Sequence, residues 1–253
     1  MAGSGYNAVS APTAKTGART AVSFGLGTAF VAVLTMAFRL DIPATKGYFN
    51  LGDAAIFICA LLMGPAAGAF AGGVGSAIAD VVGYPVFAPG TLAVKGIEGF
   101  LAGALYERMR KGGSRKTSVA IAGILLALGA AISLAVSALG SEMAIALGYP
   151  FAQFSIVGVV GLELWAILVT VFGLALAYVA LRKGEPSSAT IACAVAGLEM
   201  VAGYFAYEHL LLALGILPGI VPIAEVFPNL AQALIGTAVA VPSVGQVLKA
   251  RKP

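Results

Sequence analysis

Charge is scarce in this chain. Charged residues make up 10% of its 253 residues, whereas 60% are hydrophobic and the mean hydropathy is +0.97. A soluble domain typically has about 25% charged residues, and a soluble core cannot bury so much apolar sequence. The scarcity excludes an ordinary soluble domain and predicts an all-α integral membrane protein.

Histidine and cysteine are also rare, with one histidine and two cysteines in the whole chain. Cys59 and Cys193 both lie in apolar runs, where we interpret them as small buried hydrophobic residues rather than a disulfide. The sequence lacks the zinc-protease motif H-E-x-x-H, the hydrolase motif G-x-S-x-G and the ATP-binding motif G-x-x-x-x-G-K-S/T. We therefore expect no enzyme activity, no cofactor, no bound metal and no ATP hydrolysis by the chain itself.

Long apolar runs divide the chain. Runs able to cross about 30 Å of hydrocarbon fall at 20–38, 51–63, 65–82, 91–107, 117–140, 155–181, 188–213 and 226–248. They predict about eight transmembrane helices in one domain at 19–250, after a flexible tail at 1–18. Gly64 and Pro65 separate the second run from the third, because proline inside a helix removes a backbone hydrogen-bond donor.

The basic residues predict the orientation. With both termini in the cytoplasm, 12 of the 15 lysines and arginines fall in cytoplasmic segments, as the positive-inside rule requires. They are Lys15, Arg19, Arg108, Arg110, Lys111, Arg115, Lys116, Arg182, Lys183, Lys249, Arg251 and Lys252. We therefore expect a multi-pass protein of the cell membrane with both termini cytoplasmic. Topology explains the net charge of +4, so no nucleic-acid partner is implied.

Polar side chains interrupt the apolar runs. An acid costs roughly 2.5–3.5 kcal/mol at the centre of a membrane helix, so it usually faces a cavity or a partner. Lys95 and Glu98 lie three residues apart, where they can pair with each other or contact a ligand. Asn229 and Gln232 share a helix face, where they can bond a neighbouring helix or a ligand. Most such residues fall in the outer half, which indicates a site that opens outward.

Small residues recur at four-residue spacing in two runs. Gly64, Gly68 and Gly72 predict close approach between helices. In the first run Ala21, Gly25 and Ala29 follow at four-residue spacing, and Ala37 lies eight residues further along the same face. This second stripe either packs inside the chain or accepts a helix of another subunit.

Five segments carry a family resemblance. They are GYFNLGDAAIF, LLMGPAAGAFAGGVGSAIAD, GYPVFAPGTLAVKGIEGFLAGAL, GLEMVAGYFAYEHLL and FPNLAQALIGTAVAVP. Over roughly 20–110 and 189–248 the chain resembles the substrate-binding S component of energy-coupling factor (ECF) vitamin transporters. The family typically has six membrane helices, so the resemblance implies that 117–181 holds an inserted pair.

The resemblance also implies a site and partners. Matching the family's binding regions gives the candidate substrate-binding residues Phe49, Asn50, Asp53, Lys95, Glu98, Tyr204, Glu208, Asn229 and Gln232. The implied partners are a transmembrane coupling subunit, docked on Ala21, Gly25 and Ala29, and two cytoplasmic ATPases. The implied ligand is a vitamin or vitamin precursor.

Two functions stay open from the sequence. The first is the binding subunit of an ATP-driven importer for a pyrimidine- or thiamine-like molecule, or for a riboflavin-like one. The acids expected around Lys95 are Asp53, Asp80, Glu98, Glu208 and Glu225. Their excess over one lysine favours a cationic or donor-rich ligand. The alternative is a stand-alone proton-coupled carrier, with Glu199, Glu208 or His209 as its proton site.

Overall fold

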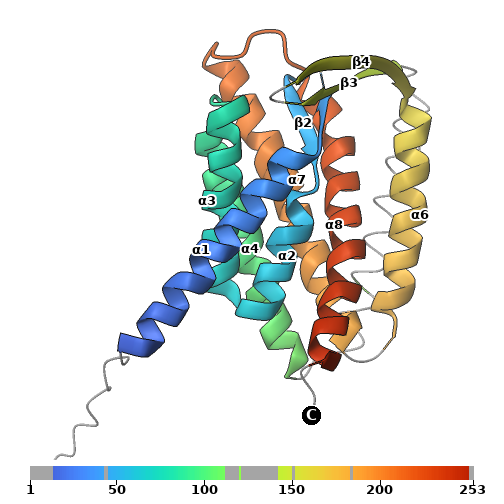
Figure 1. Cartoon of the computed structure of the whole chain (residues 1–253). Helices are drawn as coiled ribbons and strands as arrows, with labels where there is room; N and C mark the ends of the chain where they lie inside the picture. Colours follow the sequence, from blue (N-terminus) through green and yellow to red (C-terminus); the bar gives the residue numbers. More distant parts are fainter. Residues whose placement is uncertain are drawn as a thin grey trace, which may run out of the picture.

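A helical bundle makes up most of the chain. The computed structural model describes residues 14–42, 45–111, 120, 142–149, 152–182 and 185–250. The helices within these ranges are α1 (Ala14–Ala37), α2 (Gly52–Met63), α3 (Pro65–Gly83), α4 (Ala88–Arg110), α6 (Leu162–Ala180), α7 (Glu185–Ala213) and α8 (Pro222–Ala250). The start of α1 and the end of α8 lie at one end of the bundle, and the strands cover the other (Figure 1).

A four-stranded antiparallel sheet corrects the expectation of an all-α fold. Its strands are β1 (Arg39–Ile42), β2 (Gly47–Asn50), β3 (Glu142–Tyr149) and β4 (Ala152–Gly161), in the order β2-β1-β3-β4. The helix predicted at 155–181 therefore begins only at Leu162. The segment before it is rich in β-branched residues and glycine, and hydropathy alone does not distinguish an apolar strand from an apolar helix.

The predicted spans agree with the structure in part. Four described helices hold segments long and apolar enough to cross a membrane, at Thr20–Ala37, Pro65–Gly83, Pro186–Ala213 and Pro222–Ala250. The run at 117–140 lies outside the described residues except for residue 120. Helix α1 begins at Ala14, inside the segment 1–18 that the sequence predicts as a tail. Hydropathy detects where the apolar run starts, whereas a helix can extend beyond it through good helix formers such as alanine and lysine.

The glycines of α3 bring it against α4, as the spacing predicts. A Cβ atom at Gly68 would lie 2.5 Å from the Gly99 carbonyl oxygen, and one at Gly72 would lie 2.5 Å from the Lys95 carbonyl oxygen. Only glycine permits such close approach of two backbones. This packing holds the middle of α4, and with it Lys95, against the centre of the bundle.

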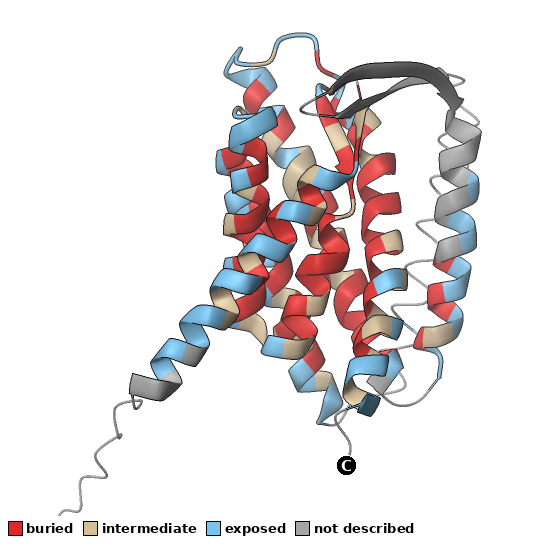
Figure 2. Ribbon diagram, in the orientation of Figure 1, coloured by how far each residue is buried: buried red, intermediate tan, exposed pale blue. Residues whose placement is uncertain are grey.

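Buried residues gather on the inner faces of α2, α3, α4, α7 and α8 (Figure 2). The opposite surfaces carry large apolar side chains, and on α1 the side chains of Val22 and Leu26 are 60% and 68% exposed. Lipid-facing side chains have no need to be polar. These exposed apolar surfaces are therefore what is expected of a helical bundle that lies in a bilayer.

Candidate ligand-binding site

A small polar cavity lies at the strand end of the bundle. Its lining residues come from α1, β2, α3, α4, α7 and α8 and the turn before α4: Thr35, Gly47, Tyr48, Asn50, Ser76, Asp80, Phe87, Thr91, Lys95, Tyr204, Glu208, Glu225, Asn229 and Gln232. The space open to the centres of water molecules is about 30 Å³. At roughly 10–15 Å³ of such space per water, about two waters fit. The cavity is polar but too small for an organic ligand in this conformation.

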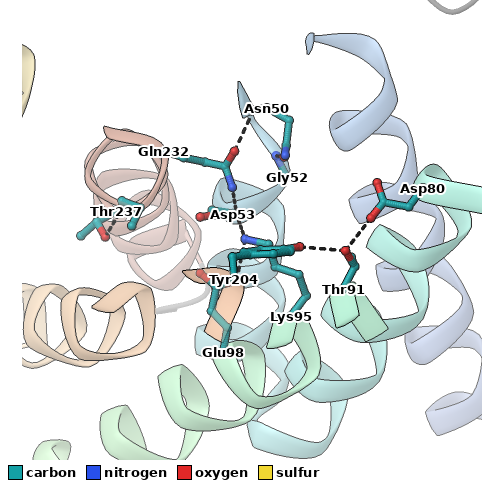
Figure 3. Close-up of polar contacts among 11 residues, drawn as sticks. Asn50, Gly52, Asp53, Asp80, Thr91, Lys95, Glu98, Tyr204, Gln232 and Thr237 are labelled. Carbon is teal, nitrogen blue, oxygen red and sulfur yellow. Dashed lines mark hydrogen bonds and ion pairs between the residues drawn. The ribbon is translucent and has the colours of Figure 1, made fainter. Parts of the chain in front are cut away.

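A buried ion-pair cluster lies beside the cavity, which its lysine lines (Figure 3). The Lys95 ammonium contacts the Asp53 carboxylate and lies 3.0 Å from Glu98 Oε2. None of these three side chains is more than 3% exposed. Two carboxylates therefore surround one ammonium, and the positive charge of Lys95 is already matched within the protein.

Gln232 ties this cluster to the strand end. Its Nε2 donates to Asp53 Oδ1 at 2.9 Å, and its Oε1 accepts from the Asn50 backbone N–H at 2.8 Å (Figure 3). The Asn50 side chain in turn accepts from the Gly52 N–H at 2.7 Å, where α2 begins. One amide therefore connects α8, β2 and α2 around the cavity.

A second network centres on Asp80. Tyr48 donates its hydroxyl to one oxygen of the Asp80 carboxylate, and Thr91 donates to the other. The Tyr204 hydroxyl donates to Thr91 Oγ1 at 2.9 Å (Figure 3). Both oxygens of Asp80 are thus occupied by hydroxyl donors, and the network joins β2, α3, α4 and α7.

Aromatic stacking fastens the β1–β2 hairpin to the end of α3. The rings of Tyr48 and Tyr84 stack with centroids 4.5 Å apart, and the Arg39 guanidinium lies 4.7 Å from the centre of the Tyr48 ring. Tyr84 donates its hydroxyl to Asp41. Burial raises the pKa of the Tyr48 and Tyr84 hydroxyls above their ordinary value of 10.0, and the nearby carboxylates raise it further. Both hydroxyls therefore remain donors at neutral pH.

Two further carboxylates line the cavity near the hairpin turn. Glu225 is 4% exposed and accepts a hydrogen bond from the Thr45 hydroxyl. Gly47 packs directly on it, since a Cβ atom there would lie 2.9 Å from Glu225 Oε1. Glu208 is 1% exposed, and its Oε2 has no hydrogen-bond partner within the described part of the chain.

The cavity brings together six of the nine expected substrate-binding residues: Asn50, Lys95, Tyr204, Glu208, Asn229 and Gln232. The other three are not among its lining residues. Phe49 packs in an apolar cluster of the core, and Asp53 and Glu98 pair with Lys95. Lys95 and Glu98 do pair with each other, which was one of the two roles that their spacing left open.

Eight lining residues are not among the nine expected ones: Thr35, Gly47, Tyr48, Ser76, Asp80, Phe87, Thr91 and Glu225. Thr91 could have been found, because it lies four residues before Lys95 on the same helix face. No pattern in the sequence singled out Tyr48 or Phe87.

Of the candidate proton sites of the carrier hypothesis, only Glu208 is among the lining residues of the cavity. His209 is exposed, and its Nδ1 lies 2.8 Å from the Phe205 carbonyl oxygen. Glu199 is half-buried and is not among the lining residues, whereas Glu208 is. Within the described residues, no group of three histidine, cysteine, aspartate or glutamate side chains is placed to hold a metal ion.

The small-residue stripe of α1 faces away from the bundle. Ala21, Gly25 and Ala29 are exposed, and a Cβ atom at Gly25 would meet nothing within 4 Å. Gly27, on the other side of the helix, would place a Cβ atom 3.0 Å from Met63 Cε. The stripe therefore does not serve packing among the described residues.

Comparison with known proteins gives a family match and a similar protein. A family model described as "ECF-type riboflavin transporter, S component" matches residues 15–182. This match includes the segment 117–181 and ends before α7. An uncharacterized protein in the gap 3′ region of Pyrococcus woesei is 46% identical over 99 residues, which are 39% of this chain and 67% of that protein.

Proposed function

This chain belongs to the S-component family of ECF-type riboflavin transporters, and from that premise we propose that it is the substrate-binding subunit of an ATP-driven vitamin importer. The ligand is a vitamin or vitamin precursor, either pyrimidine- or thiamine-like or riboflavin-like. The observation that carries the proposal is the cavity at the strand end, where polar groups from six elements converge inside an apolar bundle. Polar groups within membrane helices are costly, and they commonly mark a functional site.

Ligand entry requires the cavity to widen. About two waters fit in the present space of about 30 Å³, whereas a small-molecule pocket typically has roughly 300–1,000 Å³. Strand β2 forms part of the cavity wall, and the contacts of Tyr84 with Tyr48 and Asp41 hold the β1–β2 hairpin to the end of α3. We propose that the hairpin moves aside to admit the ligand and returns to cover it.

Transport requires partners that hydrolyse ATP, because the chain has no ATP-binding motif of its own. We propose a transmembrane coupling subunit docked on Ala21, Gly25 and Ala29, together with two cytoplasmic ATPases. The exposure of this stripe supports the proposal, since small residues allow a partner helix to approach closely.

We propose that the strand end faces the outside and that both termini are cytoplasmic, in line with the basic residues. Single cysteines introduced at Lys46 or Gly219 should react with a membrane-impermeant maleimide added to intact cells. Cysteines at Gly112 or Gly184 should not. The native Cys59 and Cys193 are buried and should stay silent. Strong labelling at Gly112 would overturn the orientation.

Reconstitution tests the function itself. Purified chain should bind thiamine or riboflavin in calorimetry, and proteoliposomes that hold the chain alone should not accumulate either vitamin. Uptake should require the coupling subunit, the ATPases and ATP. Uptake by the chain alone, driven by a pH gradient, would favour the proton-coupled carrier instead.

A further inference from the structure

Glu208 lines the cavity and has no ion-pair partner among the described residues. Both ion pairs of the described residues belong to Lys95, which contacts Asp53 and Glu98. Asp80 accepts hydroxyl hydrogen bonds at both oxygens. Glu208 is 1% exposed, yet its Oε2 has no partner among the residues that the structure describes. A buried polar atom without a partner is unfavourable, so this oxygen is available to a ligand.

Glu225 places a second carboxylate on the same cavity. It accepts one hydrogen bond, from Thr45, and has no ion-pair partner in the described chain. It lies close enough to Glu208 for the two carboxyl groups to interact. A positive group bound beside these two acids favours their charged form, whereas a phosphate would be repelled by them.

Aromatic rings in the cavity also favour a positively charged ligand. Tyr48, Phe87 and Tyr204 line the cavity with the two acids. The faces of aromatic rings attract cations, and two of these rings already receive one in the structure. The Lys95 ammonium lies 5.7 Å from the centre of the Tyr204 ring, and the Arg39 guanidinium lies 4.7 Å from that of Tyr48. Acids and rings together form a surface suited to a positively charged nitrogen.

We propose that Glu208, supported by Glu225, is the subsite for a cationic nitrogen of the ligand, such as a protonated amine or a quaternary ring nitrogen. The inference rests on the proposed vitamin-binding function and narrows it. A thiamine-like ligand carries such a nitrogen, whereas the flavin ring of riboflavin is neutral. The subsite therefore selects the thiamine-like class.

The test compares the binding of charged and neutral ligands to the wild-type chain and to variants in which one glutamate is replaced by glutamine. Calorimetry on the purified full-length chain measures affinity for thiamine, for a neutral isostere with carbon in place of the quaternary ring nitrogen, and for riboflavin. Glu208→Gln removes the charge and keeps the shape. Glu107→Gln makes the same change at an exposed site on α4, at the other end of the bundle. Unfolding midpoints of both variants confirm that they fold.

Wild type should bind thiamine more tightly than either neutral probe. Hydrogen bonds to charged groups contribute roughly 1.5–3 kcal/mol, so Glu208→Gln should weaken thiamine binding roughly 10- to 150-fold. Affinity for the neutral isostere should change by less than about threefold in Glu208→Gln, because no charge is there to be matched. Glu107→Gln should leave all affinities unchanged. If Glu208→Gln does not fold, Glu208→Asp supplies the second measurement. It keeps the charge and should retain the preference of wild type for thiamine over the isostere.

The measurements distinguish failure of the cation subsite from failure of the proposed vitamin-binding function. Unchanged thiamine affinity in folded Glu208→Gln, or a wild type that prefers riboflavin, would overturn the cation subsite and leave vitamin binding intact. Loss of the preference for thiamine in Glu208→Asp would also overturn the subsite. Equal loss of thiamine and the isostere would mean that Glu208 only shapes the cavity. Binding of neither vitamin by wild type would overturn both the subsite and the proposed function.

Discussion

Replacement of Lys95 by methionine tests whether the buried ion-pair cluster holds the bundle together. Methionine keeps a long unbranched side chain and removes the ammonium. The Asp53 and Glu98 carboxylates would then remain, 0% exposed, without their cation. Removal of one partner of a buried ion pair costs about 3–5 kcal/mol, because the remaining charge stays buried without compensation.

This loss is large beside the total stability of a folded protein, which is about 5–15 kcal/mol. For a chain of this size it corresponds to a drop of roughly 6–20 °C in unfolding midpoint, at about 2–4 °C per kcal/mol. Circular dichroism of the helical signal during thermal unfolding in detergent measures it. Lys111→Met is the matched control, since Lys111 is exposed directly after α4.

A triple variant separates charge from shape. Lys95→Met combined with Asp53→Asn and Glu98→Gln buries no charge and should recover at least roughly half of the lost stability. Wild-type stability in Lys95→Met alone would refute the reasoning. So would a triple variant no more stable than the single one, because the cost would then come from packing rather than from unpaired carboxylates.

Three further predictions follow from the packing and the hairpin. Gly99→Val should abolish folding, because its Cβ atom would lie 2.1 Å from the Gly68 carbonyl oxygen, whereas Gly245→Val has open space and should unfold at the wild-type midpoint. Gly25→Leu should prevent co-purification of the coupling subunit but leave the unfolding midpoint unchanged, since Gly25 is exposed; a retained partner would contradict docking there. Because burial raises the pKa of Tyr84 above its ordinary 10.0, the stability that its neutral hydroxyl contributes should be constant below about pH 10 and fall above it. Unfolding from pH 8 to 11 should show a shallower fall in Tyr84→Phe, and equal slopes would argue against this role.

Local patterns in the sequence predict the bundle well. The third apolar run was predicted at 65–82, and α3 spans Pro65–Gly83. The glycine spacing in it correctly indicated close helix packing. The scarcity of charge indicated the membrane. These features depend on residues within one or two helical turns of each other, which is the range that hydropathy and periodicity report.

The strands could not be predicted from such short-range sequence patterns. β1 and β2 have four residues each and pair with one another across a turn, so they present no long alternating pattern. The segment of β4 is apolar throughout much of its length and resembles the start of a membrane helix. Its conformation depends on pairing with β3, which composition alone does not report.

The sequence by itself determined that the chain is a membrane helical bundle with polar residues near one end, and which family it resembles. Only the tertiary structure decided which of those residues face the cavity and which neutralise one another. Asp53 meets Lys95 across 42 positions, and Asn50 meets Gln232 across 182. The partner of a buried charge is set by how helices far apart in the chain pack together. The same packing leaves Glu208 Oε2 without a partner among the described residues, and no local pattern of residues contains that information.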